Sequence, residues 1–302
     1  MNFRQEIIDF RSFLQLEKSL SENSVKAYIS DIEKLFSYFQ NNKEEIQVKA
    51  IELAHLKAFI EELNLIGIAP RSQARIISGI RAYFKFLLVE GYIENDPSLL
   101  LELPSMGKKL PVFLSVQEID LLESAIDLSK EEGHRNKAII ETLYSCGLRV
   151  SELINLKITD LYFEHSFIRV TGKGNKERLV PISDSAIKEI TIYTEKYRKL
   201  LKVQGGNENI LFLNRRGKKL TREMIFTIVK DLSKKIGLNK NISPHTFRHS
   251  FATHLVDGGA DLRAVQEMLG HESIITTEIY THLSKDYLKQ TILDFHPRSI
   301  KK

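Results

Sequence analysis

Hydrophobic residues in the first hundred positions recur every three or four residues, which is the spacing of amphipathic helices. Three polar breaks divide this region into four such stretches. Ser21 or Ser24 can cap the second helix, and Gly91 stands near the end of the fourth. The pattern predicts a compact unit of four helices, at about 2–17, 25–39, 53–63 and 76–91.

The stretch LPSMGKKLP at 103–111 contains two prolines, a glycine and two lysines and shows no periodicity. These features are typical of a linker between domains. We therefore predict an N-terminal domain of residues 1–105 and a C-terminal domain of residues 106–302. The linker lysines, Lys108 and Lys109, would suit a segment that crosses a nucleic-acid backbone.

The C-terminal domain is predicted to begin with helices. Ser115 and Glu118 form a capping-box pattern at the start of a helix that runs to about Ser129. A second helix follows to about residue 145, where Gly147 ends it, and LRVSELINL reads as a third. Further helices are expected at about 185–201 and 221–236, with a short extended piece at 209–214.

One segment of this domain changes from helical to alternating periodicity. In HSFIRVTGKGNKERLVPIS, apolar residues occur at every second position on both sides of Gly172-Lys-Gly-Asn. This pattern predicts a β-hairpin. The fold class is therefore mainly α with a small β-sheet: a four-helix N-terminal domain and a mixed α/β C-terminal domain.

The stretch from Ser243 to His282 contains a dense set of polar groups that a purely structural helix pair does not need. Ser243 and Pro244 mark a helix start. His245 and Arg248 lie three residues apart, so they share one face close to the helix N-terminus, where backbone N–H groups favour an anion. The pattern indicates a phosphate-binding site.

The second half of that stretch adds a candidate nucleophile. Asp261 is placed to cap the next helix, and Gly270 ends it and leaves His271 at the break. Ser273 is expected to begin a short helix that presents Tyr280. A tyrosine hydroxyl is a reasonable nucleophile only where cations stabilise the phenolate as it attacks a phosphate.

Composition and charge restrict the classes of partner that the chain can bind. Hydrophobic residues make up 42% of the chain and charged residues 27%, as in soluble proteins, and no stretch approaches the length of a membrane span. The net charge is +5, with −3 in residues 1–103 and +8 in residues 104–302. A polyanion is a plausible partner of the C-terminal part, although this excess alone does not establish one. The N-terminus does not resemble a signal peptide.

Other chemistries fit the sequence less well. The single cysteine, Cys146, lies in an apolar run and is interpreted as a buried, inert thiol, consistent with a reducing cytoplasm. The histidine spacings do not match a zinc site. Ser250 lies beside His249 but lacks the turn motif of a serine hydrolase. His254 and His282 are interpreted as structural or surface residues.

Five motifs in order, GLRVSEL, TGKGNKER, PHTFRHSFATHL, LGH and TTEIYTH, resemble the tyrosine recombinase (phage integrase) family. With the four-helix unit before them, they are similar to its Xer-type members over nearly the whole chain. The resemblance implies a SAM-like core-binding domain that clamps DNA, followed by a catalytic domain of the tyrosine recombinase type.

The resemblance also implies the catalytic set. Arg149, Arg248 and His271 would bind the scissile phosphate, and His245 would accept or relay a proton or orient the phosphate. Lys173 would protonate the leaving 5′-oxygen, with Lys176 as its rival, and Tyr280 would be the nucleophile. Glu152 would support the first arginine. The residues expected to contact DNA are Arg71, Arg75, Arg81, Lys108, Lys109, Arg215 and Arg216.

The implied partner is a double-stranded DNA recombination site. Four protomers would act on two sites through a Holliday junction, as a homo- or hetero-tetramer, with a sister recombinase and a septal DNA translocase as further partners to consider. No metal, cofactor or ATP is implied, and the expected location is cytoplasmic, away from any membrane. The apolar residues at 287–295 predict a C-terminal helix that docks into a neighbouring protomer or packs on its own chain.

Several biological roles remain open at the level of sequence. Chromosome-dimer resolution is the role expected of an Xer-type protein, and an integrase or invertase of a mobile or phase-variable element is the alternative. A type IB topoisomerase-like relaxing enzyme would use the same chemistry. A DNA-binding protein whose catalysis has lapsed is an alternative of another class, although the complete catalytic set argues against it.

Overall fold

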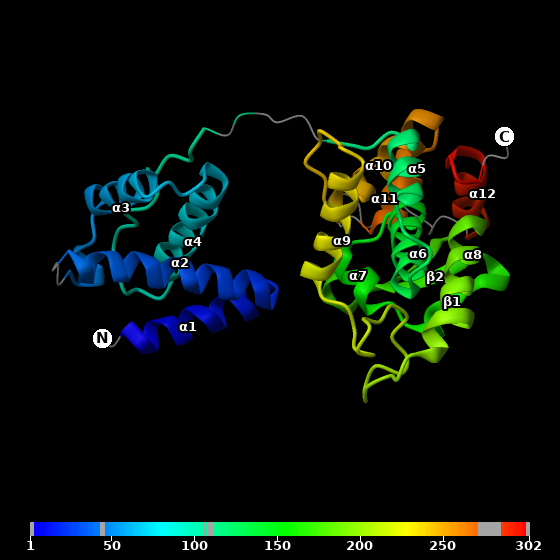
Figure 1. Cartoon of the computed structure of the whole chain (residues 1–302). Coiled ribbons are helices and arrows are strands. Elements are labelled where there is room, and N and C mark those ends of the chain that lie inside the picture. Colours follow the sequence, from blue (N-terminus) through cyan, green and yellow to red (C-terminus); the bar gives the residue numbers. More distant parts are fainter. Residues whose placement is uncertain (1–2, 43–45, 106, 108–111, 271–284, 300–302) are drawn as a thin grey trace. The chain divides into compact units, whose positions relative to one another are not determined.

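The computed structural model describes residues 3–42, 46–105, 107, 112–270 and 285–299. The chain forms two compact units, Met1–Lys109 and Leu110–Lys302 (Figure 1). The division falls within the proline- and glycine-containing segment at 103–111. Within the described residues, no helix is long and apolar enough to cross a membrane.

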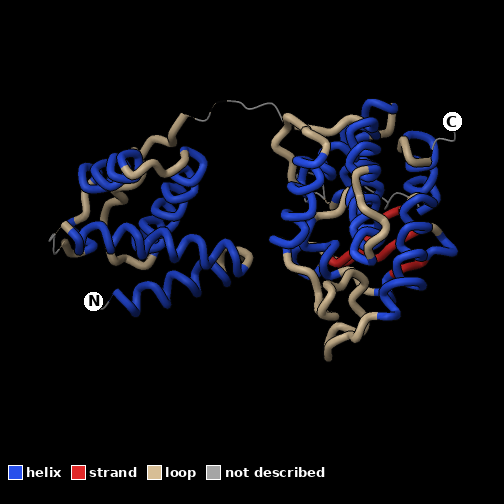
Figure 2. Tube along the Cα trace, viewed as in Figure 1, coloured by secondary structure: helices blue, strands red, loops and turns tan. Residues whose placement is uncertain are grey.

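In its described part, the N-terminal unit consists of helices joined by loops (Figure 2). Ser21 caps the second helix by accepting a hydrogen bond from the Ser24 amide at 3.3 Å. Large aromatic side chains fill the core, and the Phe10 and Tyr83 rings meet edge to face at 5.2 Å. The four predicted helices are confirmed as α1 Phe3–Leu16, α2 Glu22–Asn41, α3 Leu53–Leu65 and α4 Pro70–Val89, with a 3-10 turn at Val48–Ala50.

The C-terminal unit consists of helices around a small sheet. The capping box at its start is confirmed, because Ser115 and Glu118 exchange hydrogen bonds at 2.7 and 3.1 Å. The first helix ends five residues earlier than predicted, since Asp127 accepts two hydrogen bonds from Ser129 and forms a turn there. The helices are α5 Val116–Ser124, α6 Glu131–Cys146, α7 Val150–Asn155, α8 Asp184–Ile192, α9 Arg222–Lys235, α10 Pro244–Gly258, α11 Leu262–Leu269 and α12 Lys285–Phe295.

The segment predicted to be one helix over 185–201 is not a continuous α-helix. After α8 the chain continues as a π turn, Tyr193–Tyr197, and a 3-10 turn, Arg198–Leu200. The extended piece predicted at 209–214 forms isolated bridges, such as Lys157 with Ile210, and no strand. Tyr193, the first residue of the π turn, is 1% exposed, and its hydroxyl accepts a hydrogen bond from the Leu213 amide at 3.2 Å.

Among the described residues, three strands form one antiparallel sheet in the order β1-β2-β3. The predicted hairpin is confirmed, with Ile168 of β2 opposite Val180 of β3. The first strand is only two residues long, which is too short for an alternating pattern to reveal. The strands are β1 Leu161–Tyr162, β2 Phe167–Thr171 and β3 Glu177–Pro181.

Helix α6 is the central element of this unit. It is buried along most of its length and packs against α8 and α10. Cys146 at its end is fully buried, and burial raises the pKa of its thiol to about 12, as expected of an inert residue. Helix α12 adds Leu288 and Ile292 to the same core on its own chain, whereas docking into a neighbouring protomer stays a prediction.

An arginine after α12 joins the end of the described chain to α5 and α6. The Arg298 guanidinium pairs with Asp120, with Glu123 at 3.1 Å and with Glu141 at 3.0 Å. Glu141 is fully buried. Burial and the neighbouring Glu141 carboxyl raise the pKa of Glu123 to about 9. Arg298 provides the positive charge that compensates these buried carboxyl groups.

We expect the Arg298→Ala variant to be less stable by about 3 kcal/mol, because removing one partner leaves a buried charge without compensation. Differential scanning calorimetry of the full chain should show a lower midpoint for the C-terminal unit. Lys26→Ala, which removes an exposed ion pair with Glu22, is the control and should leave its own unit unchanged. An unchanged midpoint for Arg298→Ala would show that Arg298 does not stabilise this unit.

Candidate active site

Helix α10 places Arg248 in the interior of the C-terminal unit. Ser243 is its N-cap and Pro244 its first residue, as the sequence predicts. Phe247 and Phe251 are fully buried and fix the helix against the core. Arg248, which is 3% exposed, donates hydrogen bonds from Nη1 to the Gly147 carbonyl at 2.9 Å and from Nη2 to the Leu269 carbonyl at 2.6 Å.

The Gly147 carbonyl is available to Arg248 because α6 ends in a left-handed glycine. Gly147 has φ +58°, as predicted for a helix terminator. A Cβ at this position would lie 2.5 Å from the Phe251 ring, so both the conformation and the space require glycine. The chain thereby turns sharply and reaches Arg149 two residues later.

Arg149 is the N-cap residue of α7, and Glu152 holds it there. The Glu152 carboxylate accepts hydrogen bonds from the Arg149 amide and from its guanidinium, both at 2.8 Å. The same guanidinium donates to the Leu269 carbonyl at 3.2 Å and to the Gly270 carbonyl at 3.0 Å. Glu152, which was predicted to support Arg149, thus forms a direct ion pair with it.

A third arginine, which the sequence reading did not select, completes this cluster. Arg178 of β3 donates two hydrogen bonds to Glu152, at 2.9 and 3.0 Å, and one to the Met268 carbonyl at 2.8 Å. A signal for it existed, because Arg178 is in phase with Val180 and Ile182 on the buried face of the hairpin. A charged residue at such a position requires a buried partner.

The arginines meet at the carboxyl end of α11. Asp261 caps the other end of this helix by accepting from the Arg263 and Ala264 amides, and Gly270 ends it with φ +62°. The last carbonyls of a helix lack partners within it and carry partial negative charge, so they attract cations. Here Arg178 donates to the Met268 carbonyl, Arg149 and Arg248 both donate to the Leu269 carbonyl, and Arg149 also donates to the Gly270 carbonyl.

The electrostatics of the cluster favour an anion. Burial and, after it, the positive charge of Arg149 lower the pKa of Arg248 to about 10. For Glu152, burial would raise the pKa, but the hydrogen bonds and charge of Arg178, with the bonds from Arg149, outweigh it and lower the pKa below its usual value. In the part of the chain that the structure describes, the cluster thus has three positive groups around one carboxylate.

The hairpin tip lies against this cluster. The Gly172 amide donates to the Lys176 carbonyl at 2.8 Å, and Gly174 and Asn175 adopt left-handed conformations with φ +71° and +59°. Lys173 begins the short turn Lys173–Asn175. The direction of the Lys173 side chain lies outside what the structure describes, so its choice over Lys176 stays a prediction.

The structure brings together some of the predicted site residues and leaves others undescribed. Arg149, Arg248 and Glu152 meet, and His245 lies exposed on the first turn of α10. His271, Tyr280 and His282 fall in residues 271–284, outside the described part.

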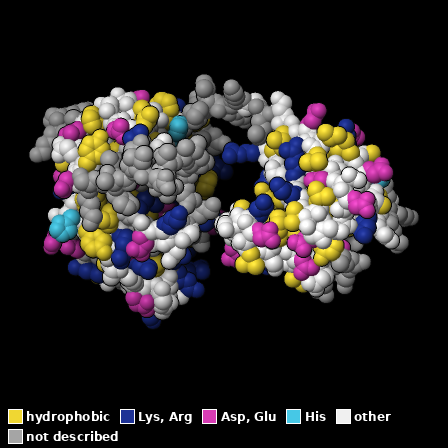
Figure 3. Space-filling view, turned by 180° about the vertical axis from the view of Figure 1, so that it is seen from behind, with side chains coloured by type: hydrophobic (Ala, Val, Ile, Leu, Met, Phe, Trp, Pro, Cys, Tyr) yellow, Lys and Arg dark blue, Asp and Glu magenta, His cyan; other side chains and the backbone are white. Residues whose placement is uncertain are grey.

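Of the residues predicted to contact DNA, some are exposed, some have partners within the protein, and some lie outside the described part. Arg71, Arg215 and Arg216 are exposed, and Figure 3 shows Lys and Arg side chains gathered on each unit. Arg75 pairs with the buried Asp31, and Arg81 donates to the Leu101 carbonyl, so both also have structural partners within the N-terminal unit. Lys108 and Lys109 lie outside the described residues.

Two residues that suggested other chemistries have structural contacts. The Ser250 hydroxyl accepts from the Leu114 amide and donates to the Thr246 carbonyl, both at 2.8 Å. His254 shares a hydrogen bond of 2.8 Å with the Tyr144 hydroxyl, which agrees with a structural role. Among the described residues, no group of three or more His, Cys, Asp and Glu side chains is placed to hold a metal ion.

Comparison with known proteins decides the family. The model of the phage integrase family matches residues 113–286, and that of the phage integrase N-terminal SAM-like domain matches residues 7–91. The chain belongs to the phage integrase family. It is a tyrosine recombinase of the Xer type, and its fold is that of this family.

Relatives and solved structures match nearly the whole length of this recombinase. It is 43% identical to tyrosine recombinase XerD of Staphylococcus epidermidis and 41% identical to that of Listeria monocytogenes, over 97% of this chain and 99% of each relative. The structure of the XerH site-specific recombinase bound to a palindromic difH substrate shares 26% identity and a TM-score of 0.69, covering 96% of this chain and 88% of that one. The Tn1549 transposon integrase with circular intermediate DNA has the same fold, with a TM-score of 0.72 at 21% identity over 94% of this chain and 98% of that one.

We expect the stability contributed by Glu152 to depend on pH. Its lowered pKa means that the folded state favours the carboxylate, so this contribution is present above the ordinary value of about 4.3 and is lost as pH falls through the lowered pKa. At pH 7 the Glu152→Gln variant should be less stable by about 3 kcal/mol. Chemical denaturation at a series of pH values should show this difference shrink below about pH 4. A difference that does not change with pH would mean that Glu152 is not ionised in the folded protein.

Proposed function

We propose that this recombinase cuts and rejoins DNA at a specific site through a covalent link between Tyr280 and the 3′-phosphate. The observation that supports this most directly is the meeting of Arg149 and Arg248 at one carbonyl. Both guanidiniums donate to Leu269, two residues before His271. Two segments far apart in the sequence therefore supply cations to one carbonyl of a third segment.

The charge of the cluster suits a phosphate diester undergoing attack. A guanidinium has five N–H donors, so the bonds that Arg149 and Arg248 make within the protein leave capacity to bind non-bridging phosphate oxygens. The pentavalent transition state carries more negative charge than the diester. Fixed cations stabilise it preferentially, and this lowers the barrier.

In the proposed reaction the Tyr280 oxygen forms a bond to phosphorus and the bond from phosphorus to the 5′-oxygen breaks. His245 accepts the phenol proton or orients the phosphate, and Lys173 gives a proton to the departing 5′-oxygen. His271 adds a donor to the phosphate. The phosphotyrosyl bond conserves the energy of the broken bond, so a 5′-hydroxyl of another strand can reverse the step without ATP.

The proposed partner is a double-stranded DNA site, bound by the exposed arginines Arg71, Arg215 and Arg216 with Arg75, Arg81, Lys108 and Lys109. Four protomers would hold two such sites and exchange strands through a Holliday junction. A sister recombinase in a hetero-tetramer and a septal DNA translocase are proposed as additional partners. The location we propose is the cytoplasm, where chromosomal DNA is accessible.

The biological role we propose is the resolution of chromosome dimers. Its support is the similarity to proteins named tyrosine recombinase XerD, which extends over 97% of the chain. A mobile-element integrase would share the chemistry but act on different DNA.

The role can be tested by identifying the DNA that the protein attacks. We expect that the purified protein, incubated with fragmented genomic DNA of its source and then denatured, retains one chromosomal sequence built from two inverted half-sites. Sequencing the covalently bound DNA provides the measurement. Recovery of the ends of mobile or invertible elements would replace dimer resolution with integration or inversion. Relaxation of supercoiled DNA without four-way junctions would indicate a topoisomerase.

The chemistry can be tested on that DNA with a nick that traps the cleaved strand. The wild-type protein should form a covalent adduct, and Tyr280→Phe should bind the DNA without forming one. Arg149→Ala and Arg248→Lys should bind normally but cleave about 100- to 1000-fold more slowly, because each loses charge-assisted bonds to the transition state.

The control for these variants is Lys188→Ala, which removes an exposed cation on α8 and should cleave at the wild-type rate. An adduct that survives Tyr280→Phe would overturn the assignment of the nucleophile. A wild-type rate for either arginine variant would contradict the phosphate-binding role.

A further inference from the structure

We propose that Arg178 is a positioning residue for strand cleavage: it anchors the β2–β3 hairpin so that the tip presents Lys173 to the scissile phosphate. This inference rests on the role proposed above for Lys173. Arg178 does not itself contact DNA in this proposal. It acts through the backbone of the two segments that it joins.

The first observation is the burial of Arg178 with a complete set of partners. It pairs across the sheet with Val170, its side chain is 14% exposed, and it lies on the face that enters the core. Its three bonds, to both oxygens of Glu152 and to the Met268 carbonyl, use the planar fork of the guanidinium. These bonds fix β3 to α7 and to the end of α11.

The second observation is that two glycines lie against this guanidinium. A Cβ on Gly172 would lie 3.5 Å from Nη1 of Arg178 and 3.6 Å from Oε1 of Glu152. A Cβ on Gly270 would lie 3.1 Å from Nε of Arg178. Gly172 directly precedes Lys173, and Gly270 directly precedes His271. The Arg178 guanidinium therefore supports the backbone immediately before two proposed catalytic residues.

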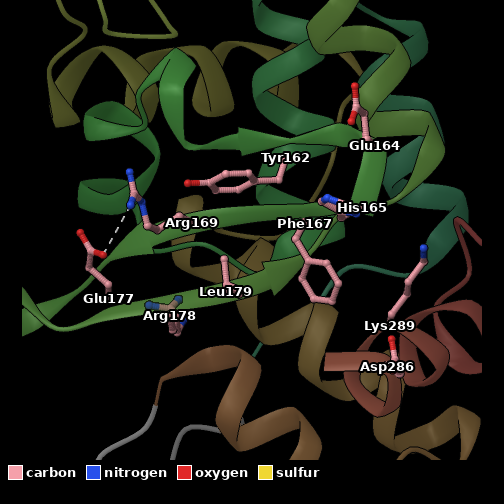
Figure 4. A pocket seen from close by; sticks show the side chains of 10 residues that line it. All are labelled: Tyr162, Glu164, His165, Phe167, Arg169, Glu177, Arg178, Leu179, Asp286 and Lys289. Carbon is pink, nitrogen blue, oxygen red and sulfur yellow. Dashed lines mark ion pairs between the residues drawn. The ribbon is translucent and has the colours of Figure 1, made fainter. Parts of the chain in front are cut away.

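The opposite face of the hairpin offers a matched control. Arg169 of β2 donates two hydrogen bonds to Asp160, at 2.9 and 2.7 Å, and faces Glu177 at 3.9 Å. Figure 4 shows Arg169 directed toward Glu177; both residues line a pocket at the hairpin, which Arg178 also borders. Arg169→Lys thus changes an ion-paired arginine on the same hairpin without altering the contacts to Gly172 and Gly270.

Arg178→Lys keeps the positive charge but removes the planar guanidinium. One ammonium group cannot reproduce the three hydrogen bonds that the guanidinium makes from three nitrogens. In single-turnover cleavage of the nicked site at saturating protein, we expect a rate about 100-fold below wild type, the loss that follows a misplaced general acid. The Kd for DNA should be unchanged. Arg169→Lys should cleave at the wild-type rate.

A second substrate separates loss of Lys173 function from general damage. Sulfur in place of the bridging 5′-oxygen leaves as a thiolate, which needs no proton because the pKa of a thiol is only about 8.5. If Arg178 positions Lys173, most of the 100-fold defect of Arg178→Lys should disappear on this substrate. The ratio of the two rate constants for one preparation does not depend on the fraction of folded protein, so partial unfolding does not disturb the comparison.

A wild-type rate of Arg178→Lys on the ordinary substrate would overturn the proposal, as would a defect of equal size on both substrates. The second result would mean that Arg178 acts through Arg149 or through folding. Failure of the proposed function is distinguishable, because the wild-type protein would then form no adduct on either substrate.

Discussion

The carboxyl end of helix α11 and the Glu152 carboxylate hold three arginines at one point, and the rest of the C-terminal unit is arranged to deliver them there. Arg149 comes from α7, Arg178 from β3 and Arg248 from α10. Like charges at this spacing repel, so the cluster requires the helix carbonyls and the carboxylate to offset that repulsion. The cluster still has an excess of positive charge, which a phosphate diester bound as proposed would offset.

The sequence predicted the helices and the hairpin because their patterns are long and periodic. Gly147 and Gly270 were predicted to end helices because each follows the end of such a pattern, and both have left-handed conformations. The two-residue strand β1 and the change of winding after α8 were not predictable, since short elements depend on tertiary packing.

The site was predicted in part. Arg149, Glu152 and Arg248 were found from their motifs and lie together in the structure. Arg178 was missed because Val180 and Ile182 identify the strand, whereas the partners that its charge requires, Glu152 and the Met268 carbonyl, come from distant positions. The structural partners of Arg75 and Arg81 could not be foreseen either, because they come from distant positions in the N-terminal unit, such as Asp31 and the Leu101 carbonyl.

Gly147 has a consequence for how this enzyme can vary. Its left-handed conformation and the adjacent Phe251 ring leave no room for a side chain, and its carbonyl is bound to Arg248. Residue 147 is therefore a point where the packing of the core and the placement of Arg248 impose the same demand. An exposed residue such as Arg215 can be exchanged without disturbing the core, but a library randomised at position 147 should return glycine. The turn that leads to Arg149 therefore tolerates less variation than the exposed surface.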